Sequence, residues 1–240
     1  MRTKLVLLPG LDGTGVLFKP LLQALAPSIE PVVITYPDRQ VLGYDALLPR
    51  VLQNLPQHDP YVLLGESFGG PLSLRIAATR PEGLRALILS ASFITCPYPF
   101  VPGWASALVR PFPFRAFPHY ARLKALMHGY ATPQLAALSA QALGQVAAAV
   151  FAGRVREVVG VDVRKELSAC AVPMLYIQGT QDRVVPAWNF QRILAVKPDV
   201  TCVRVRAPHM VLQTEPEQAA RAIEAFVQRH TDEQDNGINP

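Results

Sequence analysis

Short apolar runs alternate regularly with amphipathic segments along most of this chain. The runs are rich in Val, Ile and Leu and lack strict polar–apolar alternation, which is typical of strands covered on both faces. They occupy residues 4–8, 31–35, 61–64, 86–89, 174–178 and 201–205. Helix-like segments occupy residues 16–25, 44–55, 68–79 and 216–228. This pattern predicts an α/β fold with a doubly wound, mostly parallel sheet.

The alternation stops between residues 96 and 167. Residues 96–123 hold many prolines and aromatic residues, and residues 133–151 form an alanine-rich helical pattern. The simplest account is a small helical lid inserted between two consecutive strands. We therefore expect a core built from residues 1–95 and 168–230, a lid at 96–167 and a polar, disordered tail at 231–240.

Composition excludes several classes of protein. Half of the 240 residues are hydrophobic, yet no run of about 18 apolar residues predicts an integral membrane segment, and the apolar run at the N-terminus fits a first strand. The net charge of +5 is modest, and no nucleic-acid-binding module is recognisable. Cys96, Cys170 and Cys202 lack metal-ligand spacing, which favours free thiols in a cytoplasmic protein without a metal.

The segment Gly65-Glu66-Ser67-Phe68-Gly69 matches the pattern G-x-S-x-G between a predicted strand and a predicted helix. A sharp strand-to-helix turn of this kind exposes a serine hydroxyl at the carboxyl end of a sheet. The flanking glycines are needed because the chain passes closely there. Ser67 is therefore the candidate nucleophile, against the alternative of an ordinary turn with an incidental serine.

A serine nucleophile needs a base and an orienting acid, and both candidates follow later strands. Asp182 lies in the loop after residues 174–178, and His209 lies in the loop after residues 201–205. The order Ser, acid, His is typical of nucleophiles on such turns. Because the carboxyl ends of parallel strands meet at one edge, we predict that these three residues form a catalytic triad.

The other candidates for base and acid fit this setting less well. The remaining histidines lie before a strand, in the insertion or in the tail, where surface or packing roles are expected: His58, His119, His128 and His230. Asp162 and Asp199 lack the strand-then-loop setting, whereas Asp38 follows a strand and could border the site.

An oxyanion hole requires backbone N–H donors beside the nucleophile. We predict that the amides of Phe68 and Leu11 supply them, the latter from the glycine-rich loop 9–15 after the first strand. This loop lacks the spacing of a phosphate-binding motif, so no nucleotide or other cofactor is expected.

Four blocks together resemble the α/β-hydrolase superfamily over about residues 3–230: LLPGLDGTG, GESFGG, GTQDRVVP and PHMVLQTEPEQAARAIEAFV. The resemblance, which extends to small bacterial carboxylesterases, implies a lid, no cofactor and hydrolysis of an ester or related acyl bond. One departure is Pro9-Gly10, where many relatives carry His-Gly. The loop that follows is also similar to that of plastid phytyl ester synthase-type acyltransferases.

Three hypotheses follow: a serine esterase acting through an acyl-enzyme, an acyltransferase that uses an alcohol acceptor on the same triad, and a non-catalytic binding protein. The expected partner is a small acyl ester. Eight basic residues against two acidic ones at 96–165 could attract an acidic carrier protein, but a solvated lid surface is the preferred explanation of this charge. The aromatic residues of the insertion would line an acyl pocket or pack within the lid: Tyr98, Phe100, Trp104, Phe112, Phe114, Phe117 and Tyr120.

Overall fold

The structure is a computed structural model that describes residues 2–57, 59–111, 127 and 129–235. Its centre is a six-stranded, fully parallel sheet with the strand order β2-β1-β3-β4-β5-β6. The strands are β1 (Thr3–Leu8), β2 (Ile29–Val33), β3 (Tyr61–Glu66), β4 (Leu84–Ser90), β5 (Met174–Gly179) and β6 (Thr201–Val205). The doubly wound parallel sheet expected from the sequence is thus confirmed, with β2 beginning two residues earlier than predicted.

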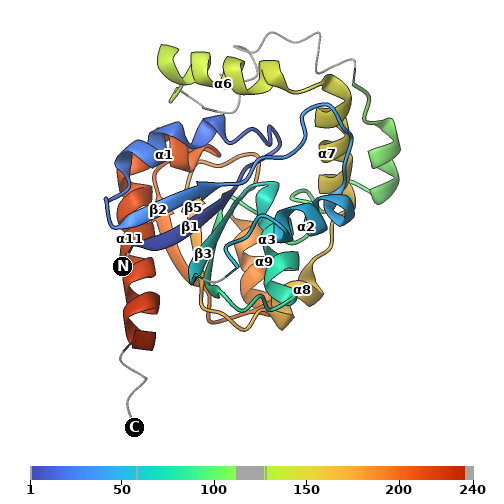
Figure 1. Cartoon of the computed structure of the whole chain (residues 1–240). Helices are drawn as coiled ribbons and strands as arrows, with labels where there is room; N and C mark the ends of the chain where they lie inside the picture. Colours follow the sequence, from blue (N-terminus) through green and yellow to red (C-terminus); the bar gives the residue numbers. More distant parts are fainter. Residues whose placement is uncertain (1, 58, 112–126, 128, 236–240) are drawn as a thin grey trace.

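Helices cover both faces of the sheet (Figure 1). On one face lie α1 (Lys19–Ala24), α10 (Val211–Thr214) and α11 (Pro216–Asp235). On the other lie α2 (Tyr44–Leu52), α3 (Gly69–Ala78), α8 (Arg164–Ala169) and α9 (Trp188–Val196). The predicted helix at 16–25 is divided into η1 (Val16–Phe18), a 3-10 turn, and α1.

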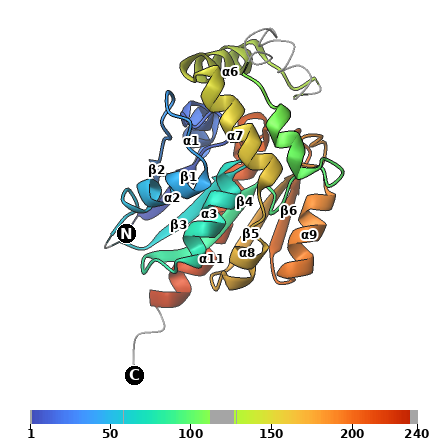
Figure 2. The ribbon, with the colours of Figure 1, turned by 90° about the vertical axis from the view of Figure 1, so that its right-hand side faces the viewer.

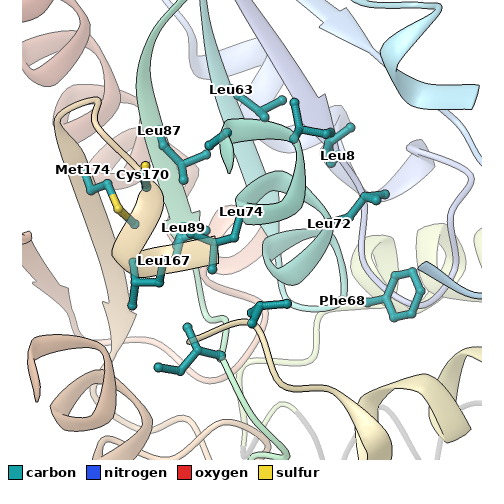
Figure 3. Packing of buried hydrophobic residues seen from close by; sticks show 14 of the residues in the cluster. Leu8, Leu63, Phe68, Leu72, Leu74, Leu87, Leu89, Leu167, Cys170 and Met174 are labelled. Carbon is teal, nitrogen blue, oxygen red and sulfur yellow. The ribbon is translucent and has the colours of Figure 1, made fainter. Parts of the chain in front are cut away.

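Side chains of each strand alternate between two separate apolar cores. In β3, Leu63 joins the core beneath α2, α3 and α8, whereas Val62 and Leu64 join the core beneath α1 and α11. Figure 3 shows part of the first core, where Leu72 and Leu74 of α3 pack over the strands. Burial on both faces explains why the strand sequences are continuously apolar.

The insertion between β4 and β5 contains η2 (Gly103–Leu108), α6 (Pro133–Gln145), α7 (Ala148–Gly160) and α8. In both views α6 lies across one end of the sheet, and α7 descends from it toward the core (Figures 1 and 2). The single helix expected at 133–151 is therefore wrong: two helices bent by 98° meet at Val146 and Ala147.

One further difference concerns the C-terminal helix, and a separate observation concerns the length and hydropathy of the helices. Helix α11 continues to Asp235, so it extends into the segment predicted to be a disordered tail. Within the described residues, no single helix is long and apolar enough to cross a membrane, and α6 and α7 meet those criteria only as a bent pair.

Candidate active site

Ser67 lies on a strained turn between β3 and α3. Its φ angle of 50° falls in the left-handed region, which is uncommon for residues other than glycine. A Cβ at Gly65 would lie 2.6 Å from the Gly69 carbonyl oxygen, and one at Gly69 would lie 2.4 Å from that of Leu8. Only glycine fits at either position, which explains the G-x-S-x-G pattern in steric terms.

The strand order explains why this turn opens into a crevice. The chain moves from β1 outward to β2 and then returns to place β3 on the other side of β1. Loops that follow β1 and β3 consequently diverge, which leaves space for a ligand at the carboxyl ends of these two strands. Ser67 follows β3, and the loop with Gly10 and Leu11 follows β1.

Backbone hydrogen bonds hold the loops of Asp182 and His209 together. The Gln181 amide donates to the Ala207 carbonyl at 3.0 Å, and the Thr180 amide donates to that of Val205 at 2.8 Å. These bonds extend the pairing of β5 with β6 beyond the strand ends. The two residues are thereby brought close together although 26 residues separate them in the chain.

Asp182, His209 and Ser67 form a continuous hydrogen-bonded chain. Asp182 Oδ2 lies 2.8 Å from His209 Nδ1, and His209 Nε2 lies 3.0 Å from Ser67 Oγ. The other carboxylate oxygen of Asp182 accepts hydrogen bonds from the amides of Val184 and Val185, each at 2.8 Å. Because both oxygens are occupied, the carboxylate has one orientation relative to the imidazole.

The charges around His209 favour its protonated form. Burial is the largest single influence and lowers the pKa of His209, but the charge and hydrogen bond of Asp182 and the charge of Glu66 outweigh it. The pKa of His209 therefore lies above the ordinary value of about 6.5.

Glu66 is a functional candidate that the sequence analysis did not single out. This carboxyl precedes the nucleophile, and burial raises its pKa to about 7. It accepts a hydrogen bond from Gln213 Nε2 at 2.9 Å. Glu66 occupies a variable position of the G-x-S-x-G pattern, so the pattern does not indicate a function for its carboxyl group. Its contact with Gln213 is visible only in the folded structure.

The two predicted oxyanion-hole residues lie on either side of Ser67. Phe68 follows it directly, and Leu11 lines the same cavity as Ser67. A Cβ at Gly10 would lie 3.8 Å from Ser67 Cβ, so the loop after β1 packs against the nucleophile. Among the turn and loop hydrogen bonds of the described residues, neither the Leu11 nor the Phe68 amide donates to a backbone carbonyl.

A cavity of about 170 Å³ adjoins Ser67 and His209. Apolar side chains from the core and the insertion form much of its wall: Leu17, Leu143, Phe151, Val184 and Met210. Three of the aromatic residues expected to line an acyl pocket are not part of this cavity wall: Tyr98, Phe100 and Trp104. Phe100 and Trp104 are exposed, and Tyr98 contacts Trp188. Phe112, Phe114, Phe117 and Tyr120 lie outside the described residues.

The alternative candidates are separate from this chain of hydrogen bonds. Asp162 pairs with Arg164 and Asp199 with Lys197, while Asp38 lines a different hollow. His230 contacts Phe226 on α11, and His58, His119 and His128 lie outside the described residues. All three cysteines are free thiols, as expected. The described side chains contain no group of three or more His, Cys, Asp or Glu residues suited to a metal ion.

Together, the sheet, the strained serine turn and the hydrogen-bonded Ser, His and Asp define the architecture of an α/β hydrolase. The model of the alpha/beta hydrolase family matches residues 5–222, so the chain belongs to this family.

Comparison with individual proteins gives sequence relatives and structural neighbours. The chain is 29% identical over 243 residues to the pimeloyl-[acyl-carrier protein] methyl ester esterase of Xanthomonas campestris pv. campestris (strain B100), which covers 93% of this chain and 94% of the relative. It resembles the enol-lactonase of Burkholderia xenovorans LB400 with a TM-score of 0.80 and 16% identity, covering 95% and 92% of the two chains. A thermophilic esterase from Thermogutta terrifontis gives a TM-score of 0.80 at 18% identity, covering 96% and 92%. The two structural likenesses show the fold.

Proposed function

We propose that this protein is a serine esterase that hydrolyses carboxylic esters through an acyl-enzyme. Ser67 is the nucleophile, His209 is the general base and Asp182 orients the imidazole. The observation that carries this proposal is the hydrogen-bonded chain from Asp182 Oδ2 through His209 to Ser67 Oγ, located at the wall of an apolar cavity. Sequence relatives named as esterases support the same class of reaction.

The proposed reaction has two half-reactions with the same proton path. Ser67 Oγ bonds to the ester carbonyl carbon while its proton moves to His209 Nε2. The carbonyl oxygen becomes an oxyanion, to which we assign the Leu11 and Phe68 amides as donors. The carbon–oxygen bond to the alcohol then breaks, and the alcohol leaves with the proton from His209. Water repeats the sequence, releases the acid and restores Ser67.

The cavity indicates the kind of acyl group. Its volume of about 170 Å³ is below the roughly 300–1,000 Å³ of common small-molecule pockets. Leu143 and Phe151 come from α6 and α7 of the insertion, so these two helices act in this proposal as a lid over the acyl group. We therefore infer a preference for short, apolar acyl chains.

An ester attached to an acyl-carrier protein is a second substrate class, because sequence relatives are named pimeloyl-[acyl-carrier protein] methyl ester esterases. The charge of the insertion supports it less than the sequence alone implied. Of its basic residues, Arg154 is buried, Arg156 binds the Val109 carbonyl and Arg164 pairs with Asp162. Arg110 is exposed but donates to the Ala107 carbonyl oxygen at 2.9 Å, and Lys165 is exposed and remains available for such a contact.

The proposal is tested with p-nitrophenyl esters of increasing acyl length and with Ser67→Ala. We expect a loss of turnover on the order of a millionfold, as found for removal of the nucleophile in subtilisin. Ser168→Ala, an exposed serine on α8, is the matched control and should keep full activity. A folded Ser67→Ala protein with near-normal esterase activity would remove Ser67 from the mechanism.

The same assay separates the remaining alternatives. If an added alcohol captures the acyl group in preference to water, the protein is an acyltransferase. If wild-type protein reacts neither with esters nor with a fluorophosphonate probe, it is a non-catalytic member of the family. A carrier-linked ester whose rate does not fall with added salt argues against electrostatic attraction of a carrier.

A further inference from the structure

Arg154 of α7 is buried, with only 1% of its surface exposed, and it bonds to the core through backbone carbonyls. Its Nη1 donates to the Leu11 and Asp12 carbonyl oxygens at 2.8 and 2.7 Å. Its Nη2 donates to the Pro37 carbonyl oxygen at 2.8 Å, and its guanidinium carbon lies 5.5 Å from the centre of the Tyr36 ring. A buried cation is tolerated only with such compensation, and the planar guanidinium can reach several acceptors at once.

The loop that Arg154 holds is the loop that carries the Leu11 amide. This loop turns at Gly10–Gly13, where the Gly13 amide donates to the Gly10 carbonyl at 3.1 Å. Gly13 has a φ angle of 67°, and a Cβ on it would lie 2.5 Å from Arg154 Nη1. The guanidinium therefore packs directly against the backbone of the turn at Gly13. The shape of the loop and the position of Arg154 consequently depend on each other.

Helix α7 also contacts the support of the second predicted oxyanion donor, Phe68. One turn beyond Arg154, Glu157 accepts a hydrogen bond from the Tyr44 amide at 2.9 Å. The Tyr44 ring stacks on Phe68 with ring centres 4.5 Å apart, and its hydroxyl donates to the Phe68 carbonyl at 3.1 Å. The same inserted helix thus contacts structures on both sides of Ser67.

We propose that Arg154 is a positioning residue for ester hydrolysis: it sets the loop of Leu11 so that its amide meets the oxyanion. This inference rests on the proposed serine-esterase function. It makes the reaction dependent on the docking of α7, because the loop loses two carbonyl contacts, those of Leu11 and Asp12, when the guanidinium is removed. A misplacement of about 1 Å is sufficient to cost about a hundredfold in rate.

The test compares Arg154→Met and Arg154→Lys with Arg156→Met as the matched control. Arg156 lies on the same helix and also donates to a backbone carbonyl, that of Val109 at 2.8 Å, but its contact stays within the insertion. We expect Arg154→Met to lower the acylation rate about a hundredfold with little change in KM. Arg154→Lys should retain part of the rate, and Arg156→Met should retain all of it.

Two readouts separate positioning of the oxyanion loop from general destabilisation. A trifluoromethyl ketone inhibitor forms an oxyanion on Ser67, so its affinity should fall in parallel with the acylation rate, whereas the affinity for the neutral alcohol product should not. In Arg154→Ala, added methylguanidine should restore part of the rate, and it should have no effect on Ser67→Ala.

If Arg154→Met fails to fold, Arg154→Lys and the methylguanidine experiment decide the question. Folded Arg154 variants with wild-type acylation rates and ketone affinity would overturn the inference while Ser67→Ala remained inactive. Activity in Ser67→Ala would instead refute the proposed function itself, so the two failures are distinguishable.

Discussion

Replacing Asp182 by asparagine changes one carboxylate oxygen to an NH2 group and tests the role of His209 directly. Asp182 Oδ1 accepts from the amides of Val184 and Val185, so the asparagine oxygen should stay at that position. The NH2 group then faces His209 Nδ1, where Asp182 Oδ2 now lies at 2.8 Å. Because NH2 only donates, the imidazole must carry its proton on Nε2, which faces Ser67 and can no longer accept the serine proton.

The size of the effect follows from the alternative orientation of the amide. Turning the asparagine to restore the productive tautomer would place its NH2 against the two backbone N–H groups of Val184 and Val185. Each buried N–H left without an acceptor costs about 1–3 kcal/mol, so the productive form lies about 2–6 kcal/mol higher. This alone lowers the rate by a factor of about 30 to about 3 × 10⁴. Loss of the negative charge beside the imidazolium adds to this, and the same exchange in a chymotrypsin-type enzyme costs about 10⁴-fold.

The assay is the pre-steady-state release of p-nitrophenol at a pH where His209 is neutral in the wild type. Asp199→Asn is the matched control, since Asp199 is exposed and pairs with Lys197, away from His209. Thermal unfolding of each variant checks that the fold is intact. A folded Asp182→Asn protein with a rate within about tenfold of wild type would contradict the assigned roles of Asp182 and His209.

The remaining predictions concern the neighbours of the nucleophile. The raised pKa of His209 keeps the imidazole protonated to higher pH, so esterase activity should reach half its maximum above about pH 6.5. Glu66→Gln removes a negative charge near His209 and should move this midpoint downward. An unchanged pH profile would contradict the electrostatic effect of Glu66 on His209. Between pH 4.5 and about 7 the unfolded chain ionises Glu66 while the folded chain keeps it protonated, so the free energy of unfolding of the wild type falls as pH rises. In urea unfolding, Glu66→Gln should therefore gain up to about 3 kcal/mol relative to the wild type across this window. A difference in unfolding free energy that does not change with pH would refute this. Gly69→Ala should destabilise the fold by several kcal/mol or displace Ser67, because the new Cβ would meet the Leu8 carbonyl at 2.4 Å; a stable, fully active variant would show that the turn is less crowded than described.

The sequence alone determined the features that depend on local pattern. Apolar runs between helical segments indicated the parallel sheet, because strands buried on both faces have no polar side. Ser67, Asp182 and His209 each follow such a run, and the carboxyl ends of parallel strands share one edge. Their proximity was therefore predictable from chain order, although their catalytic roles remain a proposal.

Other features were decided only by tertiary structure, since they depend on contacts between distant segments. The pattern at 133–151 is continuous, yet the helix breaks where the Ala147 amide donates to the Asp38 carbonyl at 3.0 Å. Arg154 occurs in a sequence that suits an exposed position, and its burial follows from carbonyls more than 100 residues away. The spacing of residues along the chain does not indicate which backbone carbonyls will lack a partner after the sheet has formed. Only the packed structure therefore shows that a guanidinium lies beside these carbonyls.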